Sequence, residues 1–183
     1  HRASLMAHFV KVLPYRTFRL HPAVCKPYGA DFDGDEMNVH GPQTEEARAE
    51  AQVLLNVNSN LFSPKNGMNL MGCVKDASSG NYMLAEGELS KEDASQLLYE
   101  SGVSISDLAK QNTGAEVFSK ILPKDLQGSK VDYTGFKSEK GDFLKKADKE
   151  IGRDETMELL KNVFTLGVTF LSRTGFTISA SDL

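Results

Sequence analysis

Cysteine is scarce in this chain: only Cys25 and Cys73 occur among 183 residues, and they form no CxxC pair. Two thiols so far apart favour neither a disulfide framework nor a zinc site, so we expect both to be buried and free. No apolar run approaches the roughly 18 residues that a membrane span requires, and no secretory signal peptide is recognisable. We therefore expect a globular protein without a membrane partner. The chain begins at His1 in the middle of a pattern, so we also expect it to be a fragment of something longer.

An excess of basic residues is also lacking, because 21 Lys and Arg face 25 Asp and Glu, a net charge of −4. Free-standing nucleic-acid-binding proteins usually have a basic footprint. The distribution of charge is more informative than its sum, since residues 1–27 contain five basic side chains and no acid. A basic segment beside acids is what a phosphate–metal site would require. The alternative is that these side chains lie on exposed strand faces, and we favour it for Lys11 and Lys26.

Three acids follow this basic segment at once, because residues 31–35 read Asp-Phe-Asp-Gly-Asp. Two like charges about 4 Å apart repel by roughly 4 kcal/mol at an effective dielectric near 20, so such a cluster requires solvent, protonation or a bound cation. In a strand, Asp31, Asp33 and Asp35 would share one face but spread over roughly 13 Å, too far for one ion. Gly34 instead permits a tight loop in which their oxygens converge.

Carboxylate oxygens in a tight loop suit Mg²⁺, which takes few protein ligands and leaves room for water and phosphate. A solvated acidic turn explains these five residues equally well. An EF-hand does not, because its loop requires Gly at position six and Glu at position twelve. Counted from Asp31, those positions are Glu36 and Pro42.

The flanking residues carry a resemblance to a known family. Residues 29–40 read Gly-Ala-Asp-Phe-Asp-Gly-Asp-Glu-Met-Asn-Val-His. This stretch resembles the metal-binding loop in the largest subunit of multisubunit DNA-dependent RNA polymerases. The resemblance continues through residues 15–20 (Tyr-Arg-Thr-Phe-Arg-Leu) and 42–50 (Pro-Gln-Thr-Glu-Glu-Ala-Arg-Ala-Glu). It is closer to the archaeal and eukaryotic branch than to the bacterial one, and residues 122–126 (Leu-Pro-Lys-Asp-Leu) favour the archaeal branch.

The resemblance implies an α+β fold in two parts. Residues 1–73 would form the C-terminal half of a double-psi β-barrel, with the metal loop and a following helix. Residues 74–183 would form a mainly helical, pore-type domain.

The resemblance also implies a function in transcription. Asp31, Asp33 and Asp35 match the family's catalytic residues, which hold a permanently bound Mg²⁺ at the RNA 3′ end for ribonucleotidyl transfer. In a two-metal mechanism the first ion activates the attacking hydroxyl and the second steadies the leaving pyrophosphate. Partners would be the other polymerase subunits, the second-largest above all, with template DNA, RNA product and nucleoside triphosphates. The location would be the cytoplasm of an archaeon or the nucleus of a eukaryote. The isolated chain is expected to be inactive.

The sequence departs from the family pattern in two places. The family places Asn before Ala-Asp, where its amide helps to select a ribonucleotide, but this chain has Gly29. Residues 125–140 are also shorter than the corresponding family region. These departures keep open the alternative of a non-catalytic interaction or scaffold module with a degenerate loop. A calcium-binding structural domain is the third hypothesis.

Sequence patterns predict the local elements as well. Alternating side chains predict strands over residues 6–13 and 17–24. Capping residues and apolar stripes predict five helices, over residues 44–55, 90–99, 104–110, 114–122 and 154–171. Residues 56–70 read as a long loop, and residues 127–141 as a flexible connection.

Overall fold

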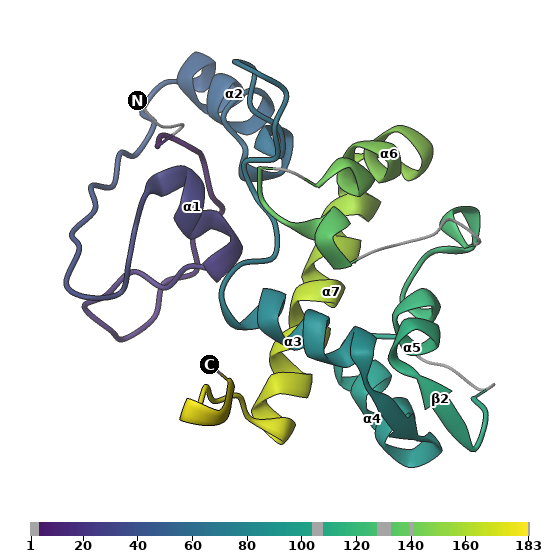
Figure 1. Cartoon of the computed structure of the whole chain (residues 1–183). Coiled ribbons are helices and arrows are strands. Elements are labelled where there is room, and N and C mark those ends of the chain that lie inside the picture. Colours follow the sequence, from purple (N-terminus) through teal and green to yellow (C-terminus); the bar gives the residue numbers. More distant parts are fainter. Residues whose placement is uncertain (1–3, 104–107, 128–132, 140, 183) are drawn as a thin grey trace.

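The computed structural model describes residues 4–103, 108–127, 133–139 and 141–182, and the longest helix in these ranges is α7 (Arg153–Thr174). It runs through the middle of the molecule, from α6 at one end to the C-terminal segment at the other (Figure 1). Its buried face includes Leu160, Val163 and Phe164, spaced as on one side of a helix. The predicted helix over residues 154–171 is therefore confirmed.

Helix α3 (Asp76–Glu86) packs closely against α7 because both helices have a glycine where they cross. A Cβ atom at Gly80 would overlap the backbone carbonyl of Gly167, and one at Gly167 would overlap the carbonyl of Ala77. The buried Asn81 adds a bond from its Nδ2 to the Val163 carbonyl at 3.2 Å. No local pattern in the sequence predicted α3, whose glycine and serines are weak helix formers. Packing on α7 stabilises it instead.

A two-stranded antiparallel sheet, β1 (Glu88–Ser90) and β2 (Gln111–Thr113), leads into two further helices. Strand β1 continues into α4 (Lys91–Glu100), and β2 into α5 (Gly114–Lys120). The Ser90 and Thr113 hydroxyls accept hydrogen bonds from backbone N–H groups three residues on, which caps each helix. The predicted helices over residues 90–99 and 114–122 are confirmed. Residues 108–110 are not helical, and the remainder of that predicted helix lies outside the described residues.

Residues 133–139 pack into the core, although we predicted a flexible connection over residues 127–141. They contain the 3-10 helix η4 (Tyr133–Phe136), whose Phe136 is fully buried. The Cys73 N–H donates to the Phe136 carbonyl at 2.8 Å, and the Glu139 N–H to the Asn69 carbonyl at 2.9 Å. A second 3-10 helix, η3 (Lys124–Leu126), precedes this segment, and α6 (Asp142–Ile151) follows it and packs on α7. The part of the prediction over 128–132 and 140 lies outside the described residues.

The N-terminal region contains short helices where we predicted strands. Its elements are η1 (Pro22–Val24), α1 (Cys25–Tyr28), α2 (Glu45–Val53) and η2 (Val57–Asn60). The predicted strands over residues 6–13 and 17–24 are wrong. Over residues 6–13 the structure gives one β-bridge, between Ala7 and Asn56. An alternating sequence forms a strand only where a neighbour pairs with its backbone. The predicted helix over residues 44–55 is confirmed as α2, capped by Thr44.

The architecture over the described residues is α+β, with far more helix than strand. The half barrel predicted for residues 1–73 is not seen in them, because both strands belong to the second part of the chain. In the described part, no helix is long and apolar enough to span a membrane. The final short element is η5 (Ala180–Asp182).

Candidate functional site

The acidic loop begins where the short helix α1 ends. The chain leaves α1 at Gly29, which adopts the left-handed conformation with φ 65° and ψ 30°. The Gly29 N–H donates to the Lys26 carbonyl at 3.1 Å, and the Ala30 N–H to the Cys25 carbonyl at 3.0 Å. Glycine and asparagine are the residues that most readily occupy such a helix end. The backbone thus explains why either residue fits here, although glycine offers no amide.

The loop folds back on itself after Ala30. The Asp31 N–H donates to Oδ2 of Asp35 at 2.9 Å, which closes the five-residue turn. Gly34 lies inside the turn with a φ of 118°, a conformation that other residues rarely adopt. The predicted tight turn around Gly34 is therefore confirmed.

The three carboxylates themselves do not converge as we predicted. Among the described residues, no three His, Cys, Asp or Glu side chains lie close enough together to hold a metal ion. Asp31, Asp33 and Asp35 are all exposed, so each can keep its hydration by staying apart from the other two. Asp31 pairs instead with Lys75, whose Nζ lies 3.3 Å from Oδ1. The assignment of the three aspartates as metal ligands stays a prediction.

The residues of the loop nevertheless fit a magnesium ion by their chemistry. Three carboxylates within five residues offer the hard oxygen ligands that Mg²⁺ prefers, and their exposure leaves room for water and phosphate. The turn already brings Asp35 back to the backbone of Asp31. What the structure lacks is the approach of all three side chains to one point.

Sequence reasoning missed Lys75, the basic residue that faces the loop. It lies at the start of α3 with a positive φ of 50°, 44 residues after the aspartate it pairs with. No local spacing links two residues that far apart, and a single lysine in a loop carries no signal of its own.

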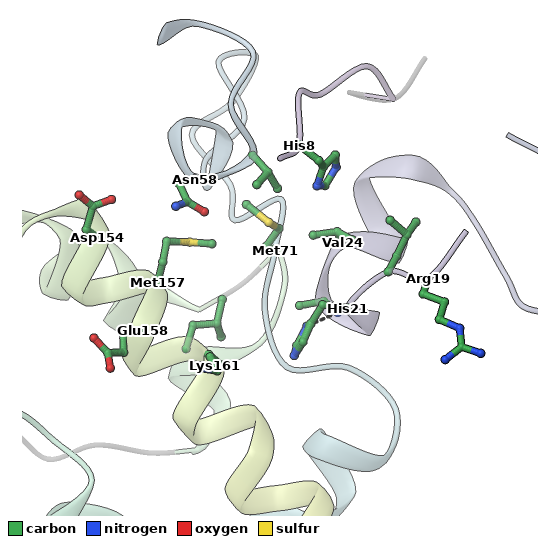
Figure 2. A pocket seen from close by; sticks show the side chains of 14 residues that line it. His8, Arg19, His21, Val24, Asn58, Met71, Asp154, Met157, Glu158 and Lys161 are labelled. Carbon is green, nitrogen blue, oxygen red and sulfur yellow. Dashed lines mark hydrogen bonds between the residues drawn. The ribbon is translucent and has the colours of Figure 1, made fainter. Parts of the chain in front are cut away.

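A cavity of about 590 Å³ lies between the N-terminal region and α7 (Figure 2). His8, Arg19 and His21 come from the N-terminal side, and Met157 and Lys161 come from α7. Its wall is also apolar in part, through further side chains that include Val24, Met71 and Leu160. The cavity thus offers a mixed surface where the two parts of the chain meet.

The two histidines of this cavity are held by neighbours. His8 Nε2 lies 2.6 Å from the Tyr28 hydroxyl, and the His21 ring packs edge-on against Phe164, with centroids 4.6 Å apart. Burial lowers the pKa of both imidazoles, and Lys161 lowers that of His21 further. Both are therefore neutral at pH 7.

Comparison with known protein families assigns both parts of the chain. Residues 1–57 match the family model described as RNA polymerase Rpb1, domain 2, and residues 60–183 match RNA polymerase Rpb1, domain 3. The chain therefore belongs to the Rpb1 family of RNA polymerase largest subunits. Its two parts come from the N-terminal portion of that subunit, which confirms the resemblance seen in the sequence.

Curated relatives agree with this assignment. The chain is 36% identical to the DNA-directed RNA polymerase subunit Rpo1N of Methanothermobacter thermautotrophicus, with 100% of this chain and 25% of the relative covered. It is 47% identical to Rpo1N of Thermococcus celer over 69% of this chain and 15% of the relative. It is 53% identical to the DNA-directed RNA polymerase III subunit RPC1 of Saccharomyces cerevisiae over 46% of this chain and 6% of the relative. The chain thus spans about a quarter of the length of the relatives that cover it fully.

Proposed function

We propose that this chain carries the catalytic magnesium loop of a DNA-directed RNA polymerase, with Asp31, Asp33 and Asp35 as the ligands. The observation that carries the proposal is the acidic turn itself, within a region that matches the Rpb1 domain 2 model. When bound, the ion would activate the RNA 3′ hydroxyl and neutralise charge on the incoming phosphates. The chain would thereby serve template-directed ribonucleotidyl transfer in transcription.

The chain's own residues would position the ion and do no covalent chemistry. Phosphoryl transfer depends on placement and charge neutralisation more than on a general base in the protein. Gly29 ends α1 and Gly34 permits the turn, so the two glycines shape the short segment that contains the three aspartates. Gly29 supplies no side-chain amide, so we assign ribose selection to no residue of this chain.

We further propose that the two parts of the chain are pieces of a larger assembly. Residues 1–73 would complete a double-psi barrel with other segments of the subunit, and residues 74–183 would form the pore-type domain. The second-largest subunit, template DNA, RNA and nucleoside triphosphates would be the partners. The location would be cytoplasmic in an archaeon and nuclear in a eukaryote.

The test is a full-length subunit assembled with its partner subunits and assayed for RNA extension. Asp33→Asn should abolish extension, because it removes a charged ligand but keeps the size of the side chain. Asp142→Asn is the matched control, since this exposed carboxylate lies on α6 and pairs with Lys145. Full activity of the Asp33→Asn enzyme would refute the proposal.

The second candidate is an interaction or scaffold module with a degenerate loop. Two observations favour it: the separated carboxylates and the glycine at position 29. Titration of Mg²⁺, Mn²⁺ and Ca²⁺ into the chain distinguishes the candidates. A catalytic loop should bind Mg²⁺ and Mn²⁺ and lose them in Asp33→Asn, whereas a scaffold module with a degenerate loop should bind none of the three ions. Preference for Ca²⁺ would instead indicate the calcium-binding domain.

A further inference from the structure

Two ion pairs join the acidic loop and the helix before it to the second part of the chain. Lys26 in α1 pairs with Glu139, with Nζ 3.0 Å from Oε1. Asp31, at the start of the loop, pairs with Lys75 at 3.3 Å. The two pairs have opposite polarity, because the loop side contributes one cation and one anion.

The partners on the second side share an uncommon backbone conformation. Over the described residues, the two non-glycine residues with positive φ are Lys75, at 50°, and Glu139, at 76°. Such angles are uncommon for residues with a Cβ atom and persist only where the surroundings enforce them. Here the same two residues provide both ion-pair partners of the loop region.

The backbones that carry Lys75 and Glu139 are bonded to each other. The Glu139 N–H donates to the Asn69 carbonyl, and the Cys73 N–H to the Phe136 carbonyl. The buried Asn69 side chain adds two bonds from Nδ2, to the carbonyls of Lys137 at 3.1 Å and Gly141 at 2.6 Å. Residues 69–75 and 136–139 therefore form one connected support.

We propose that this support is a clamp that orients the acidic loop, with Lys75 and Glu139 as its positioning residues. Lys75 holds Asp31 at the start of the turn, and Glu139 holds α1 one turn earlier through Lys26. The two pairs have opposite polarity. A shift of the loop that placed Lys26 beside Lys75, or Asp31 beside Glu139, would therefore bring like charges together. The clamp itself is independent of any metal; its service to the metal ligands rests on the function proposed above.

The clamp is tested in the metal-free chain by the exchange of loop amide protons with water, followed by NMR. The Ala30 and Asp31 N–H groups are suitable probes, because both donate hydrogen bonds at the start of the loop. An exposed ion pair changes an opening equilibrium by up to about fivefold. We expect Lys75→Gln to accelerate exchange at both amides by a factor within that range. A nearby positive charge attracts hydroxide, so its loss by itself would slow base-catalysed exchange. Acceleration therefore reports opening of the loop.

Three controls separate a clamp from a general loss of structure. Lys145→Gln removes a comparable exposed ion pair on α6 and should leave the loop amides unchanged. Lys75→Arg should retain slow exchange, since it keeps the charge. In 1 M salt, where screening acts over about 3 Å, the wild type and Lys75→Gln should converge.

The second arm of the clamp has its own rescue. Glu139→Lys should accelerate exchange at Ala30, because it places two cations together, and the double variant with Lys26→Glu should reverse this effect.

Unchanged loop exchange in Lys75→Gln, or acceleration equal to that of Lys145→Gln, would overturn the clamp. A parallel Mn²⁺ titration of the wild type and Asp33→Asn tests the proposed function separately. If loop exchange responds as expected but Asp33→Asn binds Mn²⁺ as the wild type does, the clamp stands and the metal assignment fails.

Discussion

At the scale of single residues, glycines determine how closely α3 and α7 approach. An alanine in place of a helical glycine normally stabilises a helix by roughly 0.5–1 kcal/mol. At Gly80 the added Cβ would overlap the Gly167 carbonyl, and a backbone cannot move aside as a flexible side chain can. Steric overlap therefore outweighs helix propensity at this position.

We predict that Gly80→Ala lowers the free energy of unfolding by about 1–3 kcal/mol, the usual cost of overpacking. Urea denaturation followed by circular dichroism measures this change. Gly41→Ala is the control, because its Cβ would have Gln43 Nε2 at an ordinary 3.7 Å as its nearest contact. A Gly80→Ala chain as stable as the Gly41→Ala chain would contradict the close crossing.

The two thiols differ in burial, which separates their reactivity. We expected both to be buried; Cys73 is, but Cys25 is only half-buried. Burial raises the pKa of Cys73 to about 12. It raises that of Cys25 as well, with a further rise from Asp31 and an opposing effect of Lys75. Both thiols are therefore protonated at pH 7, and thiolate is the reactive form.

We predict that a thiol reagent at pH 8 modifies one cysteine per folded chain, slowly, and that this cysteine is Cys25. Cys73 should react only after denaturant unfolds the chain. Mass spectrometry of the modified peptides identifies the site, and Cys25→Ser is the control, in which no thiol should react before the chain unfolds. Modification of Cys73 in the native chain would show that the core around it opens.

At the scale of elements, the sequence predicted those helices whose signals are local. Thr44, Ser90 and Thr113 each cap the helix that follows, as side chains near in sequence can do without tertiary help. Helix α3 and the segment around Phe136 depend on contacts with distant residues, so local patterns missed them. The predicted strands failed for the related reason that a strand requires a partner. The roles of Lys75 and Glu139 were not predicted for the same reason, because their ion-pair partners lie far away in the sequence.

We predict that Ser90→Ala destabilises the chain by about 1 kcal/mol, the typical value of a lost helix cap. The Ser90 hydroxyl accepts from the Asp93 N–H at 3.1 Å, and alanine offers no acceptor. Ser90→Thr should restore most of the stability. Ser119→Ala, at an exposed position inside α5, should change the unfolding free energy by less than about 0.5 kcal/mol. Equal effects of the two alanine substitutions would argue against the cap.

At the scale of the whole molecule, the N-terminal region is the part least supported by packing. Phe9 and Val12 are 86% and 91% exposed, and Phe18 is 56% exposed. Apolar side chains gathered on one exposed segment mark an interaction site or a tendency to aggregate. Helix α7, by contrast, has buried side chains along most of its length. The two parts of the chain should therefore differ in stability.

We predict fast amide exchange over residues 6–24 and slow exchange over residues 154–171 in a dilute sample of the chain. At higher concentration the chain should self-associate, and Phe9→Ser with Val12→Ser should reduce this association. Hydrogen exchange and sedimentation velocity measure the two effects. The reverse order of exchange rates in a monomer would contradict this assignment of stability.

We also predict that the isolated 183-residue chain extends no RNA primer. It spans only about a quarter of the length of the relatives that cover it fully, and the function proposed above requires partner subunits. A primer-extension assay with nucleoside triphosphates and Mg²⁺ tests this. Extension that disappears in Asp35→Ala would show that the chain is sufficient for the reaction.

The central position of α7 places a constraint on its length. Its 22 residues make a rod of about 33 Å. At one end, Arg153 Nη1 donates to the Ser59 carbonyl at 2.8 Å; at the other, Arg173 Nη2 lies 2.6 Å from Glu100 Oε1. One inserted or deleted residue would turn everything beyond it by about 100° and move it by about 1.5 Å. A change of one residue in the length of α7 would therefore leave its two ends out of register, so that the contacts of Arg153 and of Arg173 could not both be kept.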